Sequence, residues 1–119
     1  MRLTPEEADL IERTTALARE VVAPNAARWE RERRIGHEAL PAAVDLGLLR
    51  LPVPKTFGGL DHSFLCKARI AEVLAAADFG FAMSLLNTQN VAANLARNAR
   101  PDVAARHVPS FVNVPMCIS

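Results

Sequence analysis

The uncharged stretch at residues 79–96, FGFAMSLLNTQNVAANLA, decides the fold of this 119-residue chain. Its length corresponds to about five helical turns, and it carries no Asp, Glu, Lys or Arg on any side. A helix without a charged face is covered by other elements, so we predict a central helix from Phe79 to about Asn98. Its three asparagines and one glutamine make it too polar for a bilayer, and we expect no membrane insertion.

Helices that can cover this central helix are predicted on both sides of it. Before it, Ser63 is a suitable N-cap for a helix that continues to about Ala77. After it, a helix is expected in PDVAARHVPSFV, residues 101–112, where Pro109 can separate the last turn.

A long helix is predicted at the N-terminus. Thr4, Pro5 and Glu7 have the spacing of a capping box with proline in the first turn. Pro24 is expected to stop or kink this helix, which resumes through the charged NAARWERERR until Gly36 interrupts it.

A short helix and a rigid connection follow. HEALPAAVDL, residues 37–46, is expected to end at Gly47 in the left-handed conformation. The next segment, LPVPKTFGGLDH at residues 51–62, joins two helices through two prolines and the pair Gly58 and Gly59. We interpret these glycines as a turn that needs positive φ. A phosphate-binding role is not favoured, because no strand precedes the pair.

These elements predict one all-α domain over residues 1–113, a bundle of about five to six helices around the central apolar helix. The final NVPMCIS alternates apolar and smaller residues, which is a weak strand signal for residues 114–119. An apolar strand needs a partner, and no second strand is predicted. The sequence therefore predicts the first part of a larger protein.

Composition excludes several classes of function. Fourteen basic residues balance 13 acidic ones and are interspersed with them, so nucleic acid and anionic membranes are not expected as partners. Cys66 and Cys117 match no metal or redox spacing and are expected to be reduced thiols, with a disulfide as the minor alternative. The opening MRLTPEEADL has no apolar core of a secretion signal, so we expect a cytoplasmic protein.

The remaining chemistry-bearing residues indicate structural roles. His37, His62 and His107 are dispersed and lack metal-ligand spacing, so no metal site is predicted. Trp29, in the charged part of the first helix, is interpreted as a packing anchor.

Three stretches together resemble the N-terminal helical domain of the acyl-CoA dehydrogenase family. They are LTPEEADLIERTTALAREVVAPNAARWERE, IGHEALPAAVDLGLLRLPVPKTFGGL and DVAARHVPSFVNVPMCIS, which cover essentially the whole chain. The second is the most specific, and the third departs from the family in having His107 where tyrosine is usual.

The resemblance implies a FAD-dependent oxidoreductase of fatty acid metabolism that dehydrogenates an acyl-CoA thioester at its α and β carbons. The glutamate base would belong to a C-terminal helical domain, and the flavin contacts mostly to that domain and to a middle β-domain, of which residues 114–119 would be the first strand. No catalytic or cofactor-binding residue is therefore assigned, and the chain alone is expected to be inactive. Family members are commonly homotetramers or homodimers.

The resemblance also implies candidate substrate contacts. It places the central helix at the far end of the acyl pocket, where Leu85, Leu86, Gln89 and Asn90 could border the substrate tail. Polar groups there would suit a short, branched or oxygenated acyl group. In the alternative interpretation, Asn87, Asn90 and Asn94 bond to neighbouring backbone and have no functional role.

Other functions stay open at this point. Acyl-carrier-protein dehydrogenases, acyl-CoA oxidases and flavin-dependent monooxygenases share the same helical domain, so the substrate could also be an acyl-carrier-protein thioester. A non-catalytic helical interaction module is the competing class. The unpaired apolar strand and the charge-free helix both argue against that module.

Overall fold

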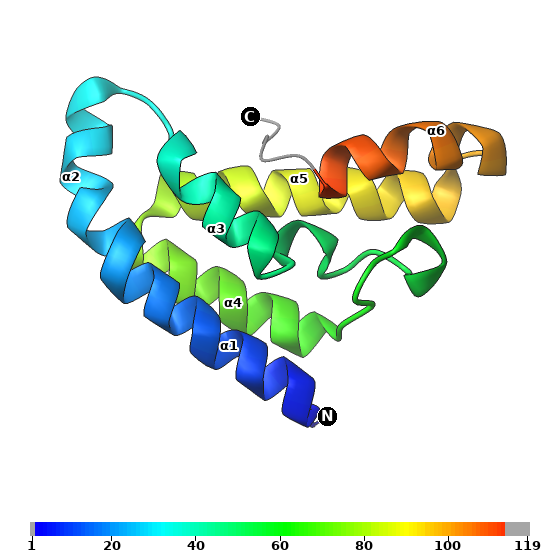
Figure 1. Ribbon diagram of the computed structural model, residues 1–119, viewed down its shortest axis with the longest axis horizontal. Coiled ribbons are helices and arrows are strands. Elements are labelled where there is room, and N and C mark those ends of the chain that lie inside the picture. The colour runs from blue at the N-terminus through cyan, green and yellow to red at the C-terminus, as the bar shows by residue number, and fades with distance from the viewer. Residues whose placement is uncertain (1, 114–119) are drawn as a thin grey trace.

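A computed structural model describes residues 2–113, which form six α-helices joined by short turns (Figure 1). The domain is flat, with principal extents of 41 × 33 × 19 Å, close to two helix diameters in its shortest direction. The all-α prediction is confirmed for these residues. The strand predicted at 114–119 lies outside them.

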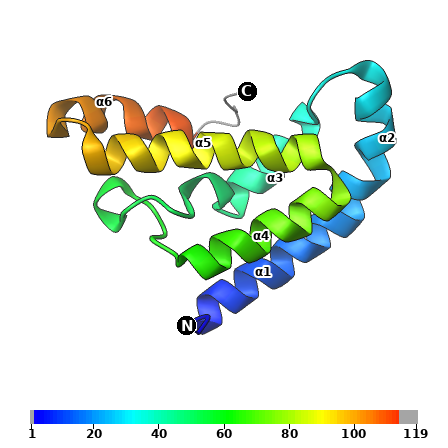
Figure 2. The ribbon, with the colours of Figure 1, turned by 180° about the vertical axis from the view of Figure 1, so that it is seen from behind.

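The helices form a V, and the 3-10 turn Leu48–Arg50 lies between its two arms. α4 (Phe64–Ala77) and α5 (Phe79–Asn98) diverge from Asp78, with α1 (Pro5–Leu17) beside α4 and α6 (Pro101–Val112) beside α5 (Figure 1). α3 (Leu40–Asp45) and the 3-10 turn Leu48–Arg50 lie on one face of this arrangement. Figure 2 shows the opposite face, where no described element covers α4 and α5.

The first helix begins at the predicted capping box. The Thr4 hydroxyl accepts from the Glu7 N–H at 3.1 Å, and the Glu7 carboxylate accepts from the Thr4 N–H at 2.9 Å. The predicted interruption at Pro24 takes the form of a π-helical turn, Ala18–Val22, after which α2 (Ala23–Glu32) continues in a new direction (Figure 1). The helix does not stop, because the wider turn accommodates the proline that an α-helical interior would not.

The end of α2 differs from the prediction. The helix ends at Glu32, before Gly36, because Arg33 takes the left-handed conformation at φ 53°. Gly36 is required for a different reason: a Cβ there would lie 2.2 Å from the Trp29 ring. Trp29 is 1% exposed and packs 5.8 Å from the Phe81 ring, which confirms its role as an anchor.

The connection LPVPKTFGGLDH is a compact loop held by its own backbone hydrogen bonds. Its two arms pair through Leu60 N–H to the Arg50 carbonyl, and through His62 N–H to the Leu51 carbonyl, both at 2.9 Å. Gly58 has φ 78°, as the predicted turn requires. Gly59 does not have positive φ; it is needed because a Cβ would lie 1.9 Å from the Val53 carbonyl oxygen.

The remaining helices confirm the predicted bounds, with two corrections. Ser63 caps α4 by accepting from the Cys66 N–H at 3.2 Å, and Asp78 caps α5 in the same way at 2.8 Å from Phe81. α6 continues through Pro109 to Val112, so its last turn is not separated from the rest of the helix. Pro109 is exposed, and water can bind the backbone carbonyl one turn earlier, which lacks a donor because proline has no N–H. α5 is also not covered on all sides, as Figure 2 shows.

The core has two parts. The larger lies between α1, α3, α4 and the first half of α5, and includes fully buried leucines of the turn Leu48–Arg50. The smaller joins the second half of α5 to α6 and to the loop through Val53. Both parts lie on the side of α5 that faces away from the uncovered surface.

Candidate functional site

The four predicted substrate contacts on α5 fall on two different faces. Leu85 and Gln89 are 1% and 3% exposed and point into the core. Leu86 is half-buried and Asn90 is exposed, so both reach the uncovered face. The structure therefore does not bring the four together, because residues that are adjacent in sequence lie about 100° apart around a helix.

The inward pair has a structural role in this chain. The Gln89 amide donates to the carbonyl of the fully buried Leu48 at 2.6 Å, which fixes α5 to the turn inside the V. Leu85 and Gln89 also line a cavity of about 10 Å³ between α4 and α5. A cavity of this size admits at most about one water molecule, so it is not a substrate pocket.

The outward face of α5 carries no charge until its last turn. Met83, Leu86 and Val91 are half-buried there, while Asn87 and Asn90 are exposed. We define these five residues as the outer α5 face. It has the size and mixed polarity to form one wall of a site for a mainly apolar ligand.

The alternative interpretation expected the asparagines of α5 to bond to neighbouring backbone. The hydrogen bonds of Asn90 and Asn94 are instead to side chains. The Asn94 carbonyl oxygen accepts from the Asn98 amide at 2.6 Å. The Asn90 carbonyl oxygen accepts from the Lys67 ammonium, which reaches across from α4. The interpretation assumed a helix buried on every side, whereas the asparagines at 87, 90 and 94 are exposed.

Lys67 is the residue of this region that sequence reasoning missed, because helical periodicity placed it on a solvated side of α4. It is half-buried. Burial, together with the nearby Arg97 guanidinium, lowers the pKa of Lys67. Arg97 itself lies 3.6 Å from the Asp61 carboxylate.

A buried carboxylate lies at the N-terminal end of α4, where Ser63 caps the helix. Glu7 is 3% exposed, and its two oxygens accept from the N–H groups of Thr4 and Ser63 at 2.9 and 2.6 Å. These donors lower its pKa to about 2. Because both its oxygens are engaged, Glu7 stabilises the fold and is unsuited to act as a base.

An open groove of about 850 Å³ lies between the end of α2 and the start of α5. Its basic residue Arg34 is held by Glu38 at 2.8 Å and by Glu32 at 2.7 Å. Arg34, and the Trp29 N–H at 2.6 Å, hold the pKa of Glu38 well below its usual range. The charge of Arg34 is therefore already paired within the chain.

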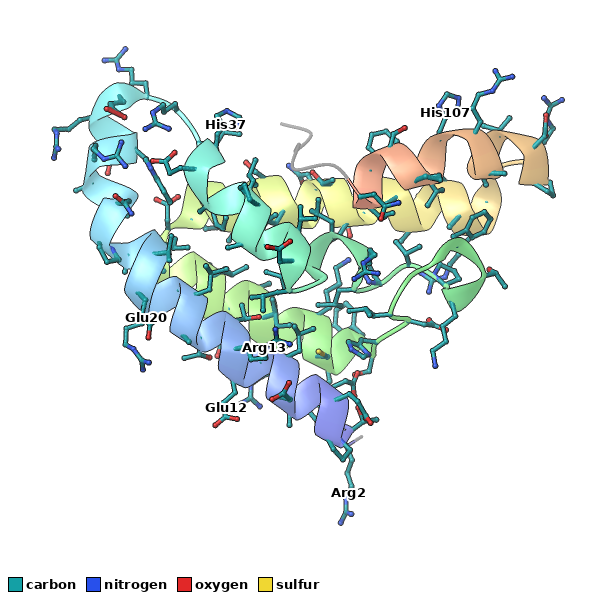
Figure 3. All side chains as sticks on the ribbon, viewed as in Figure 1. Arg2, Glu12, Arg13, Glu20, His37 and His107 are labelled. Atoms are coloured by element: carbon teal, nitrogen blue, oxygen red, sulfur yellow. The ribbon has the colours of Figure 1, made fainter. Side chains whose placement is uncertain are left out.

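The histidines and Cys66 lie apart from the outer α5 face. Figure 3 shows His37 before α3 and His107 on α6, on different elements and pointing outward. Within residues 2–113, no group of three His, Cys, Asp or Glu side chains could hold a metal ion, and no helix is long and apolar enough to span a membrane. Cys66 is a buried free thiol whose pKa burial raises to about 11; Cys117 lies outside the described residues.

Comparison with known proteins identifies the domain. Residues 4–114 match the family described as "Acyl-CoA dehydrogenase, N-terminal domain". A search of curated proteins found no match.

Solved structures share the fold at low sequence identity. Butyryl-CoA dehydrogenase from Megasphaera elsdenii is 18% identical with a TM-score of 0.83, over 95% of this chain and 30% of that chain. The FAD complex of PigA is 22% identical with a TM-score of 0.80, over the same shares. A nitrososynthase from Micromonospora carbonacea var. africana is 23% identical with a TM-score of 0.74, over 98% of this chain and 33% of that one. The chain thus spans about a third of the length of these proteins.

Proposed function

The chain belongs to the acyl-CoA dehydrogenase family, whose N-terminal domain it matches, and we propose that it forms the helical wall of the acyl pocket in a FAD-dependent oxidoreductase. In this proposal the complete protein dehydrogenates an acyl-CoA thioester at its α and β carbons. Residues 1–113 are the N-terminal domain, and residues 114–119 begin the middle β-domain. The complete protein is a homotetramer or homodimer.

The outer α5 face carries the proposal. It is uncharged, partly apolar and uncovered by any described element, as the wall of a site completed by other domains would be (Figure 2). Leu86 and Asn90 are its candidate contacts for the acyl tail. Met83 and Asn87 lie one helical turn before them and extend the same wall.

The described residues do not fit a flavin site. The Val53 carbonyl packs directly against Gly59 and occupies the space inside the Gly58–Gly59 turn. No phosphate can therefore enter this turn. Arg34, which lines the groove between α2 and α5, is already paired with two carboxylates. We therefore assign the contacts to FAD, and the glutamate base, to other domains of the complete protein. The role of this chain in the complete protein is to bind and orient the acyl tail.

A second candidate function is oxygenation by a flavin-dependent monooxygenase. The fold likeness to a nitrososynthase supports this alternative, because that likeness covers 98% of this chain with a TM-score of 0.74. The family match favours dehydrogenation.

Anaerobic titration of the complete protein, purified with its flavin, separates the two. Under the first proposal, a straight-chain acyl-CoA bleaches the oxidised flavin in the absence of any other reductant, and the 2-enoyl-CoA product is recovered in equal amount. Bleaching by a reduced nicotinamide nucleotide but by no acyl-CoA would reject dehydrogenation in favour of the monooxygenase.

A further inference from the structure

Lys67 reaches from α4 to the outer α5 face and donates to the Asn90 carbonyl oxygen. Its partner is a neutral amide. Among residues 2–113, no carboxylate lies within ion-pair distance of Lys67, and the Asp61 carboxylate is engaged by Arg97 at 3.6 Å. Lys67 therefore holds a positive charge without an ion-pair partner among the described residues.

The surroundings make this charge available to an anion. Half-burial of Lys67 strips part of its hydration, and the Arg97 guanidinium adds to the positive potential, which together lower the pKa of Lys67. A carboxylate that bound here would replace the lost hydration of the ammonium and offset its repulsion from Arg97. A ligand methylene placed here would instead desolvate the ammonium without replacing its water.

Asn90 adds a second donor. Because its carbonyl oxygen already accepts from Lys67, the two N–H bonds of its amide are left for another acceptor. Neither N–H has a partner among the described residues. A carboxylate can accept from the Lys67 ammonium with one oxygen and from the Asn90 amide with the other.

An apolar path leads to these donors. Leu86 lies one helical turn before Asn90 on α5, and Ala71 lies one turn after Lys67 on α4. Leu86 and Ala71 border the same small cavity between the two helices. A hydrocarbon chain that follows this junction would meet the two donors at its end.

We propose that Lys67 and Asn90 form a specificity subsite that binds a carboxylate at the far end of the acyl group. The inference rests on the proposed function and names its substrate class: acyl-CoA thioesters whose tails end in a carboxylate. A site built for a charged group discriminates strongly against an analogue that lacks it, because its donors then stay unpaired.

The test compares two substrates on the complete, FAD-loaded protein: a straight-chain acyl-CoA and the ω-carboxyacyl-CoA with the same number of carbons. We expect the wild type to have the higher kcat/KM with the carboxylated substrate. Lys67→Met should lower this kcat/KM by about tenfold to a hundredfold, as expected for a lost charge-assisted hydrogen bond. The same variant should keep or raise kcat/KM for the plain acyl-CoA. Asn90→Leu should also lower kcat/KM for the carboxylated substrate relative to the plain acyl-CoA.

The chain offers a matched control in Lys55, its one other lysine, which is exposed on the loop. Lys55→Met should leave both kcat/KM values unchanged. The plain acyl-CoA reports folding, so an equal fall with both substrates in Lys67→Met would show a structural role and overturn the inference. Equal wild-type kcat/KM for the two substrates would overturn it while leaving the proposed function intact. If neither substrate reduces the flavin, the inference and the proposed function fail together.

Discussion

The carboxylate of Glu7 accepts a hydrogen bond from the backbone N–H of Ser63 at 2.6 Å, across 56 positions of sequence. Its other oxygen accepts from the Thr4 N–H at 2.9 Å. Ser63 is the N-cap of α4 and Thr4 the N-cap of α1. One buried side chain thus ties the starts of two helices together.

We predict that Glu7→Gln lowers the free energy of unfolding by about 1–2 kcal/mol, because the neutral amide has one acceptor oxygen for two N–H donors. The measurement is urea unfolding of the 119-residue chain, followed by the fluorescence of its one tryptophan. Glu6→Gln is the matched control, since Glu6 is exposed in the same helical turn. Equal losses in the two variants would contradict the role given to the Glu7 contacts.

The same carboxylate predicts a dependence on pH. The N–H donors of Thr4 and then Ser63 lower the pKa of Glu7 from 4.5 to about 2. Its contribution to stability is therefore complete above about pH 4.5 and is lost as pH falls through 2. The difference in free energy of unfolding between wild type and Glu7→Gln should be constant near neutrality and shrink over that acidic window. A difference that grows on acidification would contradict this assignment.

Local sequence signals were sufficient for most of the secondary structure. The capping box at Thr4, the cap at Ser63 and the left-handed Gly47 act within one helical turn, so the starts of α1 and α4 and the end of α3 could be predicted from nearby residues alone. The prolines were harder. Pro24 and Pro109 both lie inside helical segments, because a π-helical turn in one case and solvent exposure in the other remove the expected penalty.

The candidate site was only half predictable, because its geometry depends on contacts between distant segments. Periodicity grouped Leu85, Leu86, Gln89 and Asn90, but only the packing of the turn Leu48–Arg50 decides which of them face inward. The pairing of Lys67 with Asn90 spans 23 positions and has no local signal. A lysine on an amphipathic helix is ordinarily read as solvated, and its position beside α5 follows from the angle of the V.

Gly36→Ala should be strongly destabilising although φ there is ordinary. A Cβ at Gly36 would lie 2.2 Å from the Trp29 ring, so the ring or the turn must move. We expect a loss of about 2–4 kcal/mol in the free energy of unfolding, as for other forced repacking in a core. Gly80→Ala is the control, because its nearest neighbour is 3.7 Å away and alanine favours the helix. An equally mild effect at Gly36 would show that the Trp29 contact is not tight.

Gln89→Leu should destabilise the chain by removing a donor from the buried carbonyl of Leu48. The Leu48 carbonyl would keep only its long bond from the Leu51 N–H at 3.5 Å, so the loss of the shorter bond should cost about 1 kcal/mol. Asn87→Leu is the control on the same helix, since Asn87 is exposed and its replacement should change stability by less than about 0.5 kcal/mol. Urea unfolding of both variants checks this. A small effect of Gln89→Leu would mean that water replaces the amide.

Leu86→Ala should change the acyl-chain preference of the complete protein without abolishing its activity. Leu86 is half-buried on the outer α5 face, so its truncation lengthens the space at the end of the proposed pocket, and the chain length with the highest kcat/KM should increase. Leu95→Ala removes the same atoms from the same helix where it packs near α6, and it should leave the preference unchanged. An unchanged preference in Leu86→Ala would place the acyl tail elsewhere, since a side chain in contact with the tail cannot lose three carbons without altering the length that fits.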